Sequence, residues 1–553
     1  MKLLSALFLI VVGALINPAP AAVRFDHFEY AGRDTAFEQP LPAGDYRNPV
    51  IAGFYPDPSV CRVGDDFYLV NSTFAYFPGI PVFHSRDLVH WTQIGHVISR
   101  PSQVNFDGLG VNGGVFAPDL SYHDGTFYLL NTLVGAGGNC VFTARDPAGP
   151  WSDPQFLDFD GIDPSLFFDD DGRAWLVNNG PPEGKPLYSG HRAIWIQEFD
   201  VARKRLVGPR QVIVNGGVDL AKKPIWIEGP HLFRKDGWYF LICAEGGTGA
   251  QHSEVVLRSH TVTGPFEPWA KNPILTQRDL DGTAPLATTC TGHASLVVGP
   301  DGKWWATFLG CRPFAGHFWT TGRETFLLPV TWTDDDWPVI LPKGERVPNV
   351  LPAPTGTAGD AQTPTTGNFT WRDDFSHPRL GLDWVMLRQP HETWWKTGGT
   401  AGHLELEPRA ESLGGKGNPS FLGRRVQHAR FSASISVTTP HDANVTAGLA
   451  MVQSETHYFT VAIRRDGGFH AFVEEANGQP AHVVAQLDLP ASASIDLRVE
   501  ENDREITFGW RTGDGEWRQI GPVFDALPVT VQAAGDGVHF TGAVVGPFAR
   551  RDP

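Results

Sequence analysis

Three carboxylic acids and a histidine stand at matching places along the chain, each at the start of a short apolar run. Asp57, Asp163 and Glu228 lead three of these runs, His293 leads a fourth, and Ala117 leads a fifth. Three carboxylates and an imidazole directed into one cavity are costly to desolvate, so stability alone is a poor reason for their presence. Carboxyl groups gathered in this way are suited to general acid and base catalysis.

Glycosidic bond hydrolysis is the chemistry that fits these acids best, because it needs a carboxylic acid at the leaving oxygen and a carboxylate at the opposite face of the sugar. Glu228 follows the apolar run Ile225-Trp226-Ile227, which favours a raised pKa and a role as general acid. Asp163, one repeat earlier, would raise that pKa further by its negative charge. Asp57 lies two repeats from Glu228, and a wide separation of about 6.5–9.5 Å leaves room for a water molecule. We therefore predict Asp57 as general base and inversion at the anomeric carbon.

The five leading residues belong to a repeated pattern. Each repeat has a small or polar start, a short apolar strand, an Asp/Gly turn and an aromatic-rich strand, which is a hairpin signal. The repeats read DPSVCRVGDDFYLV from Asp57, APDLSYHDGTFYLL from Ala117, DPSLFFDDDGRAWLV from Asp163, EGPHLFRKDGWYFLI from Glu228 and HASLVVGPDGKWWATF from His293. Spacings of 60, 46, 65 and 65 residues leave room for about four strands per unit, which predicts a five-bladed β-propeller. Inner strands converge on the propeller axis, so the leading residues should face one mouth.

The N-terminal segment has the features of a secretory signal. Met1 and Lys2 precede an apolar run over residues 3–16, and Ala19-Pro20-Ala21 is a small-residue cleavage pattern. We therefore predict a signal peptide over residues 1–21 and export to the periplasm or the extracellular space. No later apolar stretch of about 18 residues follows, so we expect no membrane span.

The rest of the chain is predicted to form two domains. Residues 22–45 are predicted to be an N-terminal arm, and residues 46–350 the propeller. Residues 351–370, rich in Pro, Thr, Gly and Ala, indicate an exposed linker. Residues 371–553 alternate apolar and polar positions between Gly, Asn and Asp turns, which predicts a β-sandwich accessory domain. This sandwich either binds carbohydrate or packs against the catalytic unit, and the second role is favoured.

The composition excludes several classes of function. The 553 residues include 36 Phe and 18 Trp but only 3 Met, and the chain lacks long helical periodicity, which favours an all-β fold. A net charge of −17 argues against nucleic acid as a partner and favours a neutral substrate. Five scattered cysteines show no metal-binding spacing and are too few for a disulfide scaffold.

The motifs resemble those of family-43 glycoside hydrolases of the β-xylosidase/α-L-arabinofuranosidase type. The matching stretches, which cover nearly all of residues 46–335, are RNPVIAGFYPDPSV, NSTFAYFPGIPVFHSRDLVHW, FAPDLSYHDGTFYL, GIDPSLFFDDDGRAWL, IEGPHLF, TGHASLV and TGRETFLLPVTW. NPSFLGRRVQH at residues 418–428 extends the similarity into the sandwich. The resemblance implies a five-bladed propeller and an inverting mechanism. It also implies the roles already assigned to Asp57, Asp163 and Glu228.

The resemblance also implies residues that contact the substrate. Arg312 matches an arginine that reaches sugar hydroxyls in xylosidase-like relatives. The sequence departs from the family at Phe116, where many relatives have Trp, but a phenyl ring can still stack on a sugar. His293 matches a histidine on the propeller axis that in some relatives helps to hold calcium or water. Phe77, in an aromatic loop before Pro78-Gly79, is a further candidate for stacking on a sugar face. No cofactor is expected to be required, and a structural calcium ion at His293 is a secondary hypothesis because one imidazole specifies calcium poorly.

The sequence thus predicts an exo-acting glycosidase that removes a terminal pentose from xylo-oligosaccharides or arabinoxylan fragments. D-xylose and L-arabinofuranose stay open as alternatives. Two further hypotheses stay open as well: the protein is a non-catalytic carbohydrate-binding propeller, or it is a retaining fructan hydrolase of related fold. The sequence does not determine the oligomeric state.

Overall fold

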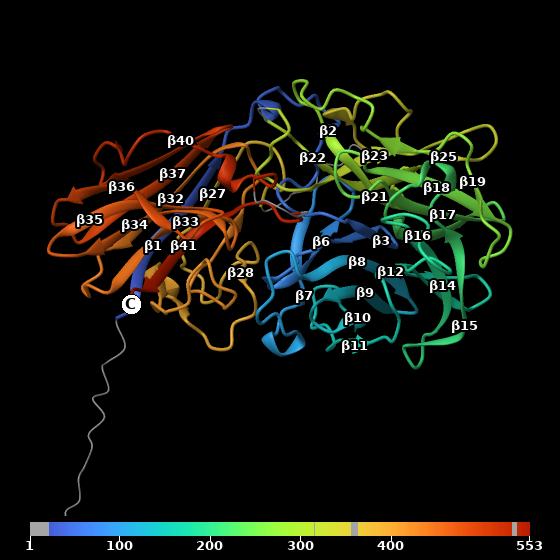
Figure 1. Ribbon diagram of the computed structural model, residues 1–553, viewed down its shortest axis with the longest axis horizontal. Coiled ribbons are helices and arrows are strands. Elements are labelled where there is room, and N and C mark those ends of the chain that lie inside the picture. Colours follow the sequence, from blue (N-terminus) through green and yellow to red (C-terminus); the bar gives the residue numbers. More distant parts are fainter. Residues whose placement is uncertain (1–20, 315, 355–362, 534–538) are drawn as a thin grey trace, which may run out of the picture.

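The computed structural model describes residues 21–314, 316–354, 363–533 and 539–553, so the predicted signal segment lies almost wholly outside the described residues. The described chain consists of strands, turns and short 3-10 helices, which confirms the all-β prediction. It forms two lobes side by side (Figure 1). Within the described ranges, no helix is both long and apolar enough to cross a membrane.

The propeller lobe contains antiparallel sheets that follow one another along the chain. The first has β3 (Ser59–Val63), β4 (Asp66–Val70), β6 (Gly79–Ser85) and β7 (Thr92–Ile98). The next has β8 (Gly114–His123), β9 (Thr126–Val134), β10 (Gly138–Ala144) and β11 (Gln155–Phe156). It is followed by the sheet of β12 (Ile162–Phe168), β13 (Ala174–Gly180), β14 (Ala193–Asp200) and β15 (Arg205–Asn215).

Two more sheets complete this lobe. One has β16 (Glu228–Lys235), β17 (Trp238–Glu245), β18 (Ser253–Ser259), β19 (Glu267–Pro268) and β20 (Leu275–Thr276). The other has β21 (Thr289–Val298), β22 (Trp304–Cys311) and β23 (Glu324–Pro329). The first strands of the sheets contact one another in a closed ring, from β3 through β8, β12, β16 and β21 back to β3. The first strands thus surround the central axis of a β-propeller, and this arrangement brings the predicted leading residues toward one another.

The Asp-Gly turns of the repeat form tight hairpins, as the sequence predicts. Asp124-Gly125 joins β8 to β9, and Asp236-Gly237 joins β16 to β17. Both residues of each turn have positive φ, at 46° and 74° in the first turn and 49° and 82° in the second. Aspartate and glycine tolerate this conformation, and the turn matches the twist of the paired strands.

Short strands close the propeller segment. β2 (Asp45–Arg47) pairs with β26 (Val350–Pro352), so its two ends meet. β24 (Thr331–Trp332) pairs with β25 (Pro338–Val339). The short 3-10 helices are η1 (Thr35–Phe37), η2 (Pro101–Gln103), η3 (Leu220–Lys222), η4 (Gly399–Ala401) and η5 (Leu527–Val529).

The sandwich lobe consists of two larger antiparallel sheets. One has β1 (Val23–Gly32), β27 (Thr370–Asp373), β29 (Trp395–Thr397), β30 (Leu404–Leu406), β32 (Arg430–Thr438), β37 (Ser494–Asn502), β38 (Glu505–Arg511), β39 (Arg518–Gln519) and β40 (Phe524–Asp525). The other has β31 (Arg424–Arg425), β33 (Val445–Ser454), β34 (His457–Arg465), β35 (Phe469–Asn477), β36 (His482–Leu489) and β41 (Val544–Arg551). Their inward apolar residues form one core.

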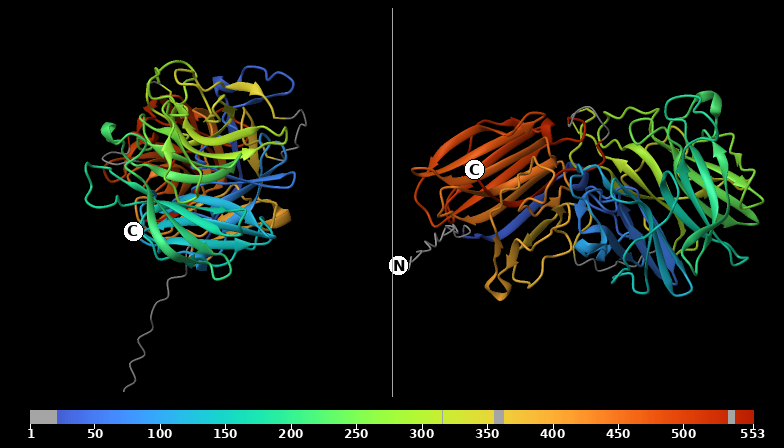
Figure 2. Two further views of the ribbon diagram at one scale, coloured as in Figure 1. Left: turned by 90° about the vertical axis from the view of Figure 1, so that its right-hand side faces the viewer. Right: turned by 60° about the horizontal axis from the view of Figure 1, so that its bottom comes forward.

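The predicted N-terminal arm is wrong for residues 23–32, because they form a central strand of the sandwich. β1 pairs with β32 on one side and with β30 and β27 on the other, and it lies in the sandwich lobe in Figure 1 and in the right-hand view of Figure 2. Phe25, Phe28 and Tyr30 are fully buried there. Burial of this apolar face stabilises the strand. Its partners lie hundreds of residues away, so the described chain starts in the sandwich, forms the propeller and then returns to the sandwich.

The two lobes also share a core and a small sheet. β5 (Tyr76–Phe77) of the propeller lobe pairs with β28 (Met386–Leu387), which follows the linker. One buried cluster joins Phe54 and Tyr76 to Val544 and Phe548 of the sandwich lobe. These contacts hold the sandwich firmly beside the mouth of the propeller.

Candidate active site

A cavity of about 520 Å³ lies at the end of the propeller where the leading residues meet. Its lining includes all five of them, namely Asp57, Ala117, Asp163, Glu228 and His293. The structure therefore brings together side chains that are up to 236 residues apart in the sequence, as the repeat pattern predicts.

A shared backbone feature directs these side chains into the cavity. Asp57, Asp163 and His293 have φ values of 53°, 54° and 52°, a left-handed conformation that residues other than glycine rarely adopt. Such strain persists where the surrounding structure holds it, and it concentrates at functional sites. The fourth sheet has Gly229 in this conformation, with φ 54°, so Glu228 stands one residue before the equivalent position. A Cβ on Gly229 would lie 2.7 Å from the imidazole of His293, so the glycine makes room for that ring.

Asp57 is held as a carboxylate. Ser72 donates a hydrogen bond of 2.6 Å to its Oδ2, and Arg323 donates one of 3.0 Å from Nη1 to its Oδ1. Burial alone would raise the pKa of Asp57, but the charge of Arg323, the nearby imidazole of His293 and the Ser72 hydrogen bond together lower it. Asp57 is therefore ionised at neutral pH and able to accept a proton.

The pKa values of Glu228 and Asp163 are raised, in contrast to the lowered pKa of Asp57. Burial raises the pKa of Glu228 well above its usual value, and the charges of Asp163 and Asp57 raise it further. Burial, with the charge of Asp57, raises the pKa of Asp163 to about 7, although the backbone N–H of Gly229 donates to its Oδ2 at 3.1 Å. These two carboxyl groups interact strongly and hold a proton near neutral pH. The cavity thus contains one ionised carboxylate and a protonated acid.

His293 is a neutral neighbour of Asp57. Its Nδ1 lies 3.5 Å from Asp57 Oδ1, but burial lowers its pKa to about 4, so the contact is not an ion pair at neutral pH. The described residues contain no group of three or more His, Cys, Asp or Glu side chains arranged to hold a metal ion. A calcium ion at His293 stays a hypothesis.

Arg323 is one of the residues of this site that were not predicted from the sequence. Its Nη1 donates to Asp57 and, at 2.9 Å, to Thr248 Oγ1, while its Nε is buried without a hydrogen-bond partner among the described residues. A buried, unsatisfied guanidinium N–H beside a cavity is a ready donor to a ligand hydroxyl. The available signal was its place in TGRETFLLPVTW, one of the stretches that carry the family resemblance.

Three phenylalanines line one wall of the cavity. Phe74, Phe116 and Phe540 lie with their ring centroids 5.4–5.5 Å apart, and the Arg323 guanidinium lies over the rings of Phe74 and Phe540. Phe540 comes from the sandwich lobe, so this accessory domain contributes to the cavity directly.

The prediction that Phe77 stacks on a sugar is wrong, because Phe77 is not among the described residues that line the cavity. Its side chain is buried in the core of the first two sheets, and its strand, β5, is held by pairing with β28.

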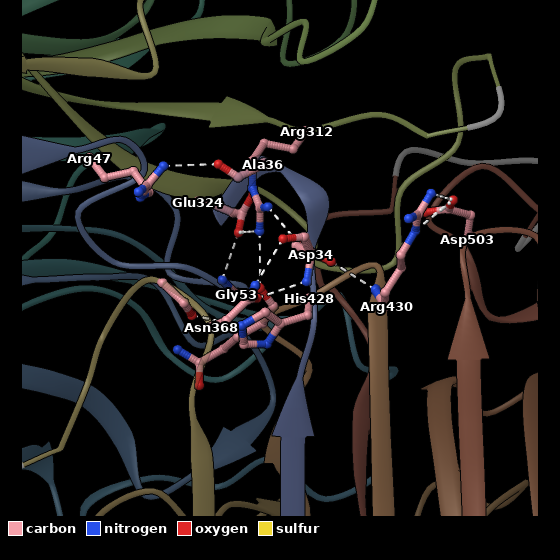
Figure 3. A network of polar contacts seen from close by, with 12 residues as sticks. Asp34, Ala36, Arg47, Gly53, Arg312, Glu324, Asn368, His428, Arg430 and Asp503 are labelled. Carbon is pink, nitrogen blue, oxygen red and sulfur yellow. Dashed lines mark hydrogen bonds and ion pairs between the residues drawn. The ribbon is translucent and has the colours of Figure 1, made fainter. Parts of the chain in front are cut away.

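Arg312 is also not in this cavity within the described chain, so its prediction as a sugar contact is wrong. Its Nε and Nη2 donate to the two carboxylate oxygens of Glu324 at 2.7 and 2.8 Å, and its Nη1 donates to Asp34 at 2.8 Å (Figure 3). Asp34 in turn accepts the backbone N–H of Arg430, which starts β32 of the sandwich. Arg312 lines a separate cavity of about 280 Å³ between the lobes. Arg312 does not reach the sugar cavity because its guanidinium is hydrogen-bonded to the buried carboxylates of Glu324 and Asp34. Arg312 therefore links the two domains.

Over most of its length the sequence is similar to proteins named as glycosidases. Residues 46–338 match the profile of glycosyl hydrolases family 43, and residues 372–552 match that of the beta xylosidase C-terminal concanavalin A-like domain. A xylosidase/arabinosidase of Butyrivibrio fibrisolvens is 37% identical, with 91% of this chain and 95% of that protein covered. A non-reducing end α-L-arabinofuranosidase of Bacteroides ovatus is 38% identical, with 84% of each chain covered.

A solved structure has the same fold. The crystal structure of a GH43_12 protein retrieved from the capybara gut metagenome superposes with a TM-score of 0.89 at 39% identity, covering 96% of this chain and all of that one. The similarity includes both lobes. It confirms the resemblance drawn from the motifs.

Proposed function

Because the chain belongs to glycosyl hydrolases family 43, we propose that it is an inverting exo-glycosidase that releases a terminal pentose from xylan-derived oligosaccharides. The bond is a β-1,4-D-xylosidic or an α-L-arabinofuranosidic one. The similar proteins named as xylosidases and arabinofuranosidases support both sugars. We further propose that the five successive sheets are five blades of one propeller.

One observation carries the proposal: Asp57 and Glu228 line the same cavity with pKa shifts in opposite directions. Glycoside hydrolysis by inversion requires a base that is ionised and an acid that is protonated at the same pH. A binding propeller has no need to keep two carboxyl groups in different protonation states.

The reaction follows from these states. Glu228 donates its proton to the leaving oxygen while the glycosidic bond breaks. Asp57 accepts a proton from a water molecule, whose oxygen attacks the anomeric carbon from the opposite face of the ring. A single displacement of this kind inverts the configuration. Arg323 orients Asp57, and Asp163 helps to keep the proton on Glu228.

Proton NMR of the anomeric region tests the proposal. Xylobiose and an α-L-arabinofuranosyl xylo-oligosaccharide are hydrolysed in parallel, and the first anomer released is followed. We expect α-xylose first from xylobiose, and the relative rates decide the preferred sugar. β-Xylose as the first product would contradict inversion. Absence of turnover would favour the carbohydrate-binding alternative, and retention with action on fructans would favour the fructan hydrolase alternative.

Replacing Asp163 with Asn is expected to shift the pH dependence of kcat/KM. The carboxylate of Asp163 is, after burial, the largest cause of the raised Glu228 pKa, so its removal lowers that pKa. The acid then loses its proton at lower pH, the alkaline limb of the profile moves to lower pH, and activity at neutral pH falls about tenfold. The kcat/KM of both enzymes is measured across pH with xylobiose. An unchanged alkaline limb would contradict this role of Asp163.

The proposed reaction requires no cofactor, and we expect removal of divalent cations to leave it unchanged. Every catalytic role in this mechanism belongs to a side chain or to water, and the described residues contain no group of three or more His, Cys, Asp or Glu side chains that could hold a structural metal ion. EDTA treatment should therefore alter neither kcat nor Tm. Activity and thermal unfolding are compared before EDTA treatment, after it and after addition of CaCl2. A loss of activity or a fall in Tm that only calcium reverses would support the hypothesis of a structural calcium ion.

We also propose that the protein is exported, on the strength of the N-terminal signal pattern in residues 1–21. Its substrate would then be met in the periplasm or outside the cell. N-terminal sequencing of the protein recovered from a cell fractionation experiment tests this, with a mature start near Ala22 expected.

A further inference from the structure

The wall of the cavity next to Glu228 carries large apolar side chains that remain exposed. Ile225 and Trp226 line the cavity and are 42% and 39% exposed, whereas Asp57 and Asp163 are 5% and 6% exposed. Exposed aromatic and aliphatic groups at the edge of a polar cavity are typical of a ligand-contact surface.

The reaction determines which part of a substrate reaches this wall. The general acid must contact the oxygen of the leaving group, and the base acts from the opposite face of the sugar. A leaving group attached to that oxygen therefore extends along the side of the cavity that carries Glu228. Trp226 lies two residues before Glu228 on the same segment, while Arg323 and Phe540 line the cavity near Asp57.

The backbone around Trp226 is held in a strained conformation. Its φ of 53° is rare for a bulky aromatic residue. Its N–H donates to the carbonyl of Gly190 at 2.9 Å, and the carbonyl of Ile225 accepts the N–H of Gly246 at 2.9 Å. Strain of this kind is retained when neighbouring contacts hold it, so the position of the indole is a built feature of the cavity.

Arg192 supports the indole ring. Its guanidinium lies 5.0 Å from the ring centroid of Trp226, which is a cation–π arrangement. Its Nε and Nη2 both donate to Asn179 Oδ1, at 3.1 and 2.8 Å, and Asn179 donates to the carbonyl of Ile227 at 2.5 Å. The arginine is thus anchored to the segment that precedes Glu228, and the exposed part of the indole is left for a ligand.

We propose that the exposed face of Trp226 binds the sugar ring of the leaving group, a xylopyranosyl unit of the xylan chain. This inference rests on the proposed function. The C–H face of a pyranose ring is apolar and can stack on the flat face of an indole, while the hydroxyl groups at the edge of the sugar remain in water. The same ring is the leaving group when terminal xylose or an arabinofuranosyl branch is released. One surface would therefore serve both reactions.

Paired substrates test the role of Trp226. Xylobiose, whose leaving group is a sugar ring, is compared with methyl β-D-xyloside, whose leaving group lacks one but has a similar need for acid catalysis. The pair of methyl α-L-arabinofuranoside and an arabinofuranosyl xylobiose is treated in the same way. We expect Trp226→Ala to lower kcat/KM about tenfold on the two substrates with a ring, mainly through KM, and less than twofold on the methyl glycosides.

Two further variants serve as controls. Trp226→Phe retains an aromatic face and should restore most of the loss. Phe156→Ala removes a phenyl group that is 51% exposed on β11, outside the cavity lining in the described chain, and should behave as wild type on every substrate. Equal losses on ring and methyl substrates, or no loss on either, would overturn the inference.

A binding measurement separates this inference from the proposed function. Calorimetric titration of Glu228→Gln with xylotriose is compared with the same titration of the double variant that also has Trp226→Ala. We expect about tenfold weaker binding of xylotriose by the double variant and equal binding of free xylose. If wild type cleaves none of the pentosides, the proposed function fails, and the titration still decides whether Trp226 binds a sugar ring. Equal affinities for xylotriose would overturn the inference.

Discussion

Glu228→Gln is expected to lower kcat on xylobiose by about 10²–10⁴-fold, the range of a lost general acid. Glutamine retains the size of the side chain but has no acidic proton to donate to the leaving oxygen. The raised pKa of Glu228, caused first by burial and then by the charge of Asp163, shows why this residue and not Asp57 carries that proton.

A comparison of two leaving groups tests the role of Glu228 as general acid more directly than the loss of activity does. A dinitrophenyl xyloside has a leaving group that needs little protonation, so Glu228→Gln should retain most of the wild-type activity on it. Steady-state kinetics on both substrates measure the contrast. Equal losses on xylobiose and on the dinitrophenyl xyloside would assign Glu228 a different role.

Glu245→Gln is a suitable control for this experiment. Glu245 is a buried carboxyl group on β17, outside the described lining of the cavity, and burial raises its pKa too. Its replacement should leave kcat within a few-fold of wild type. A large loss there would mean that any buried carboxyl group near β16 affects the reaction, whatever its position.

Arg312→Met is expected to destabilise the protein by about 3–5 kcal/mol, the cost of leaving buried charges without their partner. The Arg312 side chain is 13% exposed, and its partners Glu324 and Asp34 are 0% and 6% exposed. Methionine has a comparable length but donates no hydrogen bond. Because Asp34 also accepts the N–H of Arg430, the loss should loosen the junction between the lobes (Figure 3).

Denaturant and thermal unfolding of the full chain measure this cost, with Arg504→Met as the matched control. Arg504 pairs with Asp525 at the surface of the sandwich, where solvent screens the ion pair and its contribution to stability is small. Adding Glu324→Gln to Arg312→Met should recover part of the loss because it removes one of the unpaired charges. If Arg312 contacted the sugar instead, Arg312→Met would keep its stability and raise KM at temperatures well below Tm.

Much of this protein follows from local patterns in the sequence. Each repeat unit combines a polar leading residue, a short strand and a turn, and a turn such as Asp236-Gly237 takes its conformation from its own two residues. Strand alternation likewise depends only on near neighbours. For this reason the all-β fold and the sandwich could be predicted. So could the meeting of Asp57, Asp163 and Glu228 in one cavity.

Long-range contacts decided the rest. Arg312 and Arg323 lie close together in the sequence, and only the folded chain shows that Arg312 is held by Glu324 and Asp34 while Arg323 reaches Asp57. In the same way, the cavity wall receives a phenylalanine from the sandwich, and β1, the first strand of the described residues, is part of that sandwich. The protonation states depend on burial and on charges from distant strands. Hydrogen bonds, burial and Coulomb interactions act between atoms close in space, and the distances that set them exist only once the two lobes have packed together.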